Sequence, residues 1–146
     1  MQINLENEND TIRLAKLSAE LLKKGDIVFL YGELGAGKTF YTRHLCEYLG
    51  VTEPVSSPSY ILLNQYTGPT FMVNHLDLYR LGDAEEVFAL GITDFIEENI
   101  TIVEWPFLAE EVLPKPALKL SFSFDGEIRT VEIEGMHSKE LERKWH

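Results

Sequence analysis

The chain has 146 residues, a length at which one domain can bury a hydrophobic core of its own. Hydrophobic residues make up 45% of it and charged residues 25%, which excludes the apolar-poor composition of disordered proteins. Because 24 Asp and Glu residues stand against 13 Lys and Arg, the formal net charge is −11, and direct binding of nucleic acid or of an anionic membrane surface is not expected.

The sequence indicates a protein of the cytoplasm. Met1 to Asp10 carries three acidic residues and lacks the basic and apolar segments of a secretion signal. The strongly apolar run from Ile27 to Tyr31 is far shorter than the roughly 20 residues that span a bilayer. The single cysteine, Cys46, cannot form an internal disulfide, and we expect a buried thiol that suits a reducing compartment.

The first third of the chain predicts a helix, a buried strand and a second helix. Thr11 to Leu22 repeats apolar residues at helical spacing behind the candidate caps Asn9 and Asp10. The continuous apolar run Ile27 to Tyr31 is typical of a strand covered on both faces, as in a parallel sheet. After a glycine-rich turn, the helical spacing returns from Lys38 to Leu49.

The rest of the chain predicts mainly strands and loops. Extended patterns mark the expected strands, which are Tyr60 to Tyr66, Phe71 to Leu76, Ile100 to Val103, Leu118 to Phe124 and Thr130 to Ile133. The last two flank Asp125-Gly126, a strong hairpin signal. Asp83 to Phe95 predicts a helix interrupted near Gly91, and Thr52 to Ser59 predicts a loop. The tail from Met136 to His146 is expected to be a short helix or a frayed end with no packing partner.

A phosphate-binding loop stands between the first predicted strand and the second helix. The segment Gly32-Glu33-Leu34-Gly35-Ala36-Gly37-Lys38-Thr39 matches the Walker A pattern G-x-x-x-x-G-K-[ST]. Its glycines let backbone amides approach an anion, and the helix N-terminus adds a partial positive charge. Lys38 can reach terminal phosphates, and the Thr39 hydroxyl can ligate Mg²⁺. The expected nucleotide-contacting residues are Glu33, Leu34, Gly35, Ala36, Gly37, Lys38, Thr39 and Phe40. A glycine-rich turn without a ligand is the alternative, and the strand before it and the helix after it argue against that.

Two carboxylates are candidates for the metal side of this site. Asp77 follows the predicted strand Phe71 to Leu76, and Glu104 follows Ile100 to Val103. Ligands of open α/β sheets collect at the carboxyl ends of the strands, where the phosphate loop also lies. One or both carboxylates are therefore expected to bind Mg²⁺ or order its waters, although either can also be an ordinary loop residue. The sequence does not decide which of them touches the metal.

Other residues near these motifs allow more than one interpretation. His75 can orient Asp77 or bind a metal, or it can be a hydrogen-bonded structural histidine. Trp105 can contact a nucleotide or partner, or belong to the core. Arg80 can contact phosphate or pair with nearby acidic residues, and no catalytic role is assigned to it. The Ser56-Ser57-Pro58-Ser59 segment can be a nucleotide-sensing switch or a plain connection.

Four segments together resemble the TsaE family, the bacterial P-loop ATPases of tRNA threonylcarbamoyladenosine biosynthesis. They are the phosphate loop, Ser57-Pro58-Ser59-Tyr60, His75-Leu76-Asp77-Leu78-Tyr79-Arg80-Leu81 and Val103-Glu104-Trp105-Pro106. The resemblance runs from the opening helix to the predicted hairpin near Ile133. Ser59 stands where the family usually has threonine, which keeps the hydroxyl.

This resemblance implies a P-loop NTPase fold over residues 1–146, with a mainly parallel α/β sheet flanked by helices and a C-terminal β-hairpin. It implies a weak ATPase that binds ATP or ADP with Mg²⁺ and docks, depending on its nucleotide, on the protein complex that transfers the threonylcarbamoyl group to position 37 of tRNA. The tRNA would be met only indirectly. Lys38 would hold the phosphates and Thr39 the metal, while Asp77 and Glu104 would complete the catalytic and metal environment.

Three other functions compete with this interpretation. A small nucleotide or metabolite kinase usually places several arginines over the transferred phosphate, whereas this chain has five, widely scattered. A GTP-dependent switch would need an Asn-Lys-x-Asp segment to recognise guanine, and the sequence has none. A structural adaptor with a vestigial loop is disfavoured because Lys38 and Thr39 are both intact.

Overall fold

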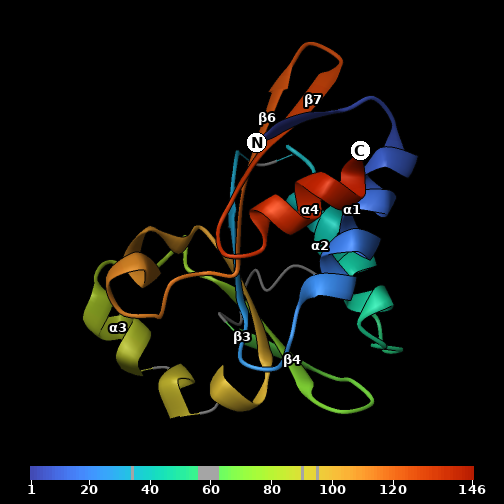
Figure 1. Ribbon diagram of the computed structural model, residues 1–146. Coiled ribbons are helices and arrows are strands. Elements are labelled where there is room, and N and C mark those ends of the chain that lie inside the picture. Colours follow the sequence, from blue (N-terminus) through green and yellow to red (C-terminus); the bar gives the residue numbers. More distant parts are fainter. Residues whose placement is uncertain (34, 56–62, 90, 95) are drawn as a thin grey trace.

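The computed structural model describes residues 1–33, 35–55, 63–89, 91–94 and 96–146. Seven strands form one sheet in the order β1-β7-β6-β2-β5-β4-β3 (Figure 1). The strands are β1 (Gln2–Leu5), β2 (Ile27–Tyr31), β3 (Leu63–Thr67), β4 (Met72–Asp77), β5 (Ile100–Glu104), β6 (Leu118–Asp125) and β7 (Ile128–Glu134). The helices are α1 (Glu8–Leu21), α2 (Lys38–Tyr48), α3 (Ala84–Ala89) and α4 (Ser138–Trp145), with 3-10 turns at Ile92–Asp94, Ile96–Glu98 and Pro106–Glu111. The predicted α/β class is confirmed.

The sheet is parallel at its centre and antiparallel at both edges. Strand β2 pairs in parallel with β5 and β6, and β5 pairs in parallel with β4. At one edge β7 runs antiparallel to both β6 and β1, and at the other edge β3 runs antiparallel to β4. The expected hairpin around Asp125-Gly126 is therefore present, and it joins the sheet through β6. The carboxyl ends of the central strands meet at one edge, where the predicted site residues stand.

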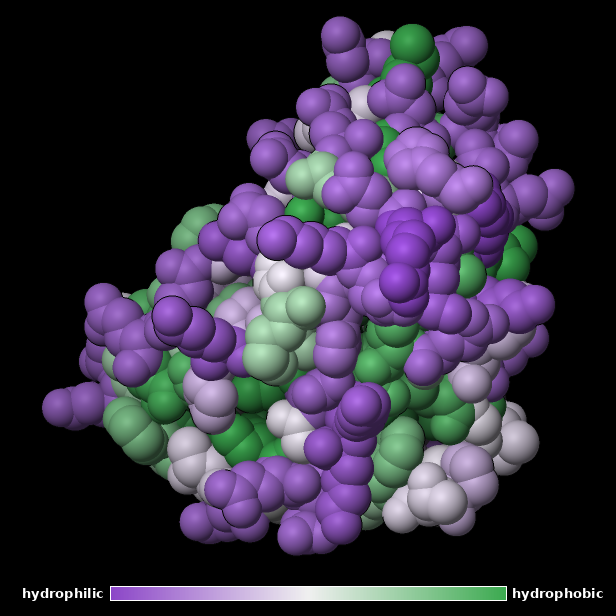
Figure 2. Space-filling model, viewed as in Figure 1, coloured by the Kyte–Doolittle hydropathy of each residue, from purple (hydrophilic) through white to green (hydrophobic). Residues whose placement is uncertain are grey.

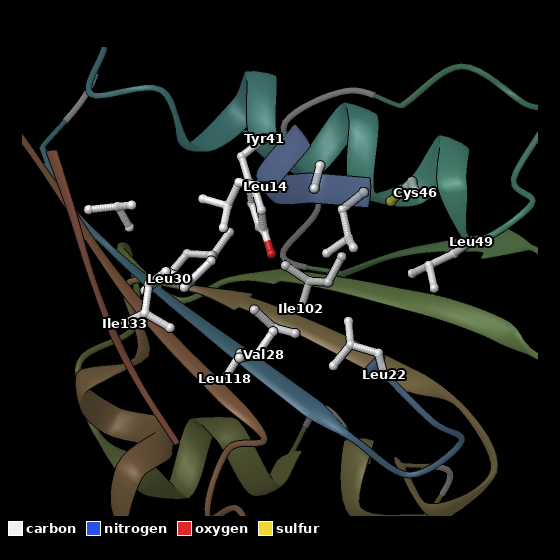
Figure 3. Packing of buried hydrophobic residues seen from close by; sticks show 14 of the residues in the cluster. Leu14, Leu22, Val28, Leu30, Tyr41, Cys46, Leu49, Ile102, Leu118 and Ile133 are labelled. Atoms are coloured by element: carbon white, nitrogen blue, oxygen red, sulfur yellow. The ribbon is translucent and has the colours of Figure 1, made fainter. Parts of the chain in front are cut away.

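Two hydrophobic cores lie on opposite faces of the sheet, and β2 contributes to both. Val28 and Leu30 belong to the core under α1, α2 and α4, while Ile27 and Phe29 belong to the core on the side of α3. Figure 3 shows Val28 and Leu30 on the face of the sheet that α1 and α2 cover. This alternation follows from the two-residue period of a strand, and it explains why the whole run is apolar. Tyr31, at the end of the run, begins the turn into the phosphate loop.

The thiol of Cys46 lies in the core beneath α2 and is fully buried, as expected. Burial raises its pKa to about 12, because a thiolate would lose its hydration there. Cys46 is therefore a packing residue that stays protonated at neutral pH.

Both ends of the chain pack more extensively than the sequence suggested. Strand β1, which was not predicted, pairs with β7 and buries Ile3 and Leu5. The predicted caps Asn9 and Asp10 are wrong, because α1 begins earlier: the side chain of Asn7 accepts a hydrogen bond from the backbone N–H of Asp10 at 3.0 Å. Helix α1 therefore starts directly after the first strand.

The C-terminal tail forms α4, and the expectation that it has no packing partner is wrong. Leu141 is fully buried, and the Arg13 guanidinium of α1 lies 4.2 Å from the centre of the Trp145 ring. Sequence periodicity missed this contact because it joins residues more than 130 positions apart. In the middle of the chain, α3 ends at Ala89, and Gly91 adopts a positive φ of 71°, which confirms the predicted interruption.

The face drawn in Figure 2 is mainly hydrophilic, and most of its hydrophobic patches gather in the lower half, where α3 also lies. Several large hydrophobic side chains are well exposed, among them Phe88 at 57%, Phe107 at 60% and Tyr79 at 67%. No helix in the described part of the chain is long and apolar enough to cross a bilayer.

Candidate functional site

One cleft at the carboxyl edge of the central strands collects residues from four separate parts of the chain. Its lining residues are Gly35, Gly37, Lys38, Thr39, Phe40, Asp77, Glu104, Trp105 and Arg129. The phosphate loop between β2 and α2 forms its floor, the ends of β4 and β5 form one side, and the start of β7 contributes to the other. The sheet order accounts for this arrangement, because β2 lies between β5 and β6.

The loop leading into α2 has the backbone of an anion cradle. Gly37 stands at the N-cap with φ of 110°, and no side chain caps the first amides of the helix. Gly35 also has a positive φ, of 84°, and a Cβ added there would meet no other described atom within 4 Å. Uncapped amides at a helix N-terminus attract anions through their N–H groups and through the helix dipole. The Thr39 side chain beside them is exposed.

Lys38 brings a buried positive charge to this cradle. Its side chain is only 5% exposed, and its Nζ atom has no hydrogen-bond partner in the described structure. The ammonium lies 4.2 Å from the centre of the Trp105 ring. Desolvation lowers the pKa of Lys38, and the nearby carboxylates of Glu104 and Asp77 oppose this shift. A buried ammonium without hydrogen-bond acceptors is unfavourable by itself and well suited to receive an anionic ligand.

Asp77 and Glu104 are brought together by the register of the sheet. The two residues are direct partners in the parallel pairing of β4 with β5. Asp77 accepts a hydrogen bond from the backbone N–H of Tyr79 at 3.0 Å. Its pKa is raised, chiefly by desolvation and also by the charge of Glu104, although the Tyr79 hydrogen bond and Lys38 act in the opposite direction. These carboxylates therefore repel each other until a cation arrives.

His75 holds Glu104 rather than Asp77. Its Nε2 atom lies 2.7 Å from a carboxylate oxygen of Glu104, and both side chains are buried. Of the two interpretations from sequence, the hydrogen-bonded histidine is confirmed, with Glu104 as the partner. The pair fixes one carboxylate oxygen of Glu104, whose side chain also lines the cleft.

Trp105 lines the cleft and takes an uncommon backbone conformation. Its φ is 54°, and no other non-glycine residue in the described ranges has a positive φ. Its ring contacts both the Lys38 ammonium and the ring of Tyr79, and the centres of the Trp105 and Tyr79 rings are 4.9 Å apart. Trp105 is thus part of the candidate site and not of the hydrophobic core.

Most of the expected site residues meet in the cleft, and some do not line it. Ala36 is buried, and its backbone N–H donates to the carbonyl of Glu33 at 3.1 Å, which shapes the loop from behind. Leu34 and the Ser57-Pro58-Ser59-Tyr60 stretch lie outside the described residues. Arg80 follows β4 and is not among the residues that line the cleft.

Arg129 is the lining residue that sequence reasoning missed. It lies at the start of β7, far from every motif, in a segment whose pattern indicates only an ordinary edge hairpin. The signal that would have pointed to it is spatial, because only the pairing of β7 beside β6 carries it to the phosphate loop.

The donor set fits a magnesium ion only together with a ligand. Within the described ranges, no three His, Cys, Asp or Glu side chains are grouped closely enough to hold a metal. Asp77, Glu104 and the Thr39 hydroxyl offer oxygen donors of the kind that Mg²⁺ prefers, but not a complete octahedral shell. Phosphate oxygens and water would have to supply the other positions, as in nucleotide-dependent magnesium sites.

Comparisons with known proteins agree on one family. The family model described as "Threonylcarbamoyl adenosine biosynthesis protein TsaE" matches residues 5–131. A curated protein of that name from Rickettsia conorii is 39% identical over 118 residues, which are 80% of this chain and 67% of the relative. Another, from Bacillus subtilis, is 37% identical over 115 residues, which are 78% and 72% of the two chains.

The fold gives the same result. The crystal structure of Bacillus subtilis YdiB superposes with a TM-score of 0.80 at 28% identity and covers 100% of this chain and 96% of its own. The segment that the family model matches contains the phosphate loop, Asp77, Glu104 and Arg129. The chain therefore belongs to the TsaE family, whose members take part in tRNA threonylcarbamoyladenosine biosynthesis.

Proposed function

We propose that the cleft binds ATP or ADP together with Mg²⁺, and that the protein is a weak ATPase acting in threonylcarbamoyladenosine formation at position 37 of tRNA. The observation that carries this proposal is the buried Lys38 ammonium. It has no hydrogen-bond partner in the described structure and stands at the uncapped N-terminus of α2, beside two carboxylates. A polyphosphate satisfies all three features at once, because it supplies acceptors to Lys38 and brings a cation to the carboxylates.

Each part of the cleft has one task in this proposal. The backbone amides around Gly37 and the Lys38 ammonium bind phosphate oxygens, and the exposed Thr39 hydroxyl and Asp77 offer metal ligands. The magnesium ion supplies charge neutralisation between the phosphates when it is bound. Phe40 lies in the first turn of α2, where its backbone amide is available to the ligand.

Glu104 is the proposed acceptor for the proton of the attacking water. His75 engages one of its carboxylate oxygens at 2.7 Å and fixes the side chain in its buried position. The other oxygen would orient the water and take up its proton, as the water oxygen bonds to the terminal phosphorus and the bond from that phosphorus to the ADP oxygen breaks. Desolvation lowers the pKa of Lys38 and the charge of Glu104 opposes this shift, so the two groups share one electrostatic environment.

Docking on partner proteins, with tRNA bound only through them, agrees with the surface of the molecule. A net charge of −11 disfavours direct contact with tRNA, DNA or anionic membranes. Beside the cleft, the exposed ring of Tyr79 packs on Trp105, and the exposed ring of Phe107 packs on Tyr31. Exposed aromatic side chains are common at protein interfaces. We propose that the protein acts in the cytoplasm, where tRNA is modified.

Calorimetry with ATP and Mg²⁺, together with ATP turnover, tests the proposal. Lys38→Ala should abolish both, whereas Lys16→Ala, which removes an exposed lysine of α1, should change neither. Absence of any heat from the unaltered protein would refute nucleotide binding. Pull-down of the threonylcarbamoyl transferase subunits with ATP, with ADP and without nucleotide tests the docking. Equal recovery in all three conditions would refute its dependence on nucleotide.

A further inference from the structure

Arg129 approaches the phosphate loop from the side opposite the two carboxylates. Its backbone lies within the sheet, where it is the register partner of Leu5 in β1 and of Phe124 in β6. A Cβ added to Gly37 would stand 3.8 Å from the Arg129 Nη1 atom. The guanidinium therefore lies beside the last glycine of the loop, and a strand paired on both sides holds its backbone in place.

The guanidinium is not occupied elsewhere in the described structure. The structure records no hydrogen bond or ion pair for it among the residues that it describes. In contrast, Arg13 lies over the Trp145 ring, and Arg143 pairs with Glu140. Arg129 is half-buried at the cleft and available to an incoming anion.

The charge of the cleft requires this second cation. Without Arg129, the lining would hold the single ammonium of Lys38 against the carboxylates of Asp77 and Glu104, and its formal charge would be negative. Such a cleft would repel the free phosphate chain that it has to capture. Arg129 brings the formal charge to zero, and its planar group can bind two phosphate oxygens at once.

We propose that Arg129 is a phosphate-binding residue, supplied by the β6–β7 hairpin of the same chain, that contacts the phosphate chain of the nucleotide opposite Asp77 and Glu104. This inference rests on the proposed binding of nucleotide at the cleft. The ligand is held between two walls: the carboxylates with their metal on the β4–β5 side, and Arg129 on the β7 side.

The test compares binding of inorganic pyrophosphate, ADP and ATP, each with Mg²⁺, by calorimetry. Arg129→Gln should weaken all three by a similar factor of about 10 or more, since a charge-assisted hydrogen bond is lost in each. Arg129→Lys should restore part of the affinity, because it keeps the charge without the bidentate geometry. Arg43→Gln removes an exposed arginine of α2 outside the cleft and should leave all three affinities unchanged.

Each other outcome has a definite meaning. If Arg129→Gln weakens ADP but not pyrophosphate, Arg129 contacts the nucleoside, and the proposal is wrong. Unchanged affinities of Arg129→Gln for all three ligands also refute the proposal for Arg129. If Lys38→Ala nevertheless loses binding, the proposed nucleotide site at the cleft still stands. A failure of the unaltered protein to bind any of the three refutes the proposed function and this inference with it. Thermal unfolding of Arg129→Lys and Arg129→Gln without ligand shows whether the variants are still folded. Weaker binding by a variant that unfolds at the same temperature as the unaltered protein then reflects a lost ligand contact.

Discussion

The Nζ atom of Lys38 lies 4.2 Å from the centre of the Trp105 ring, and within the described structure the ammonium has no hydrogen-bond partner. The ring face offers it electrostatic attraction but no acceptor for its three N–H groups. The free protein thus keeps a cation in a partly dehydrated place, where Trp105 itself takes a left-handed backbone conformation. Both features lower the stability of the free protein and favour the binding of an anion at the site.

Replacing Lys38 with methionine should therefore stabilise the free protein. The change keeps an unbranched, slightly shorter side chain beside Trp105 and removes the buried charge, so we expect the free energy of unfolding to rise by about 1 kcal/mol. Urea denaturation with and without ADP and Mg²⁺ measures this. The unaltered protein should gain stability from the ligand, and Lys38→Met should gain none. Lys16→Met is the control at an exposed site, and a destabilised Lys38→Met protein would contradict the argument.

The raised pKa of Asp77 gives a dependence of stability on pH. Because desolvation lifts the pKa in the folded protein above its ordinary value of 3.8, the folded state holds the proton more tightly than the unfolded state does. The stability that this protonation provides is fully present below 3.8 and is lost as the pH rises through the folded pKa. Asp77→Asn should thus gain stability relative to the unaltered protein as the pH increases from 4 toward 7, a series that urea denaturation in the absence of Mg²⁺ can follow. A difference that stays constant over this range would contradict the shift.

The buried hydrogen bond between His75 and Glu104 should couple the two residues strongly. His75→Ala leaves a buried carboxylate without its partner and should cost about 3 kcal/mol, whereas Glu104→Gln keeps a hydrogen-bonding group and should cost less. A double-mutant cycle of the two changes, measured by urea denaturation, should give a coupling energy of at least about 1 kcal/mol. Additive effects would show that the carboxylate of Glu104 interacts with His75 no more strongly than a neutral amide would.

Local patterns predicted the part of the site that lies near single motifs. The apolar run of β2 ends at the glycine-rich turn, so strand, loop and helix followed from consecutive residues. Asp77 and Glu104 followed from one further rule, that the ends of parallel strands meet at the same edge, and the β4–β5 register does bring them together.

The features that the sequence did not predict depend on contacts between distant segments. Arg129 reaches the cleft through the pairing of β7 with β6, and α4 packs on α1 through Leu141 and Trp145. His75 lies two residues from Asp77 on the same strand, yet it bonds across to Glu104 on the neighbouring strand. No hydrophobic period encodes such pairs, because they are set by sheet order and helix packing.

Replacing different glycines of the phosphate loop with alanine should have different effects on folding and on ligand binding. Gly32 has φ of 137°, and a Cβ there would stand 2.8 Å from the carbonyl oxygen of Phe122, so Gly32→Ala should damage the fold. Gly35 has φ of 84° and open space around it, so Gly35→Ala should cost only about 1 kcal/mol of stability. That open space is where the proposed phosphate chain lies, and we therefore expect Gly35→Ala to weaken ADP binding at least 10-fold.

Gly91→Ala is the matched control for this comparison. Gly91 also has a positive φ, of 71°, and its nearest recorded neighbour is an Asp94 carboxylate oxygen at 3.8 Å, but it lies beyond α3 and does not line the cleft. The two alanine variants should lose similar stability in thermal unfolding, and only Gly35→Ala should lose affinity for ADP in calorimetry. Equal affinities in both variants would mean that the space in front of Gly35 is not occupied by ligand, and the phosphate chain would have to be placed elsewhere in the cleft.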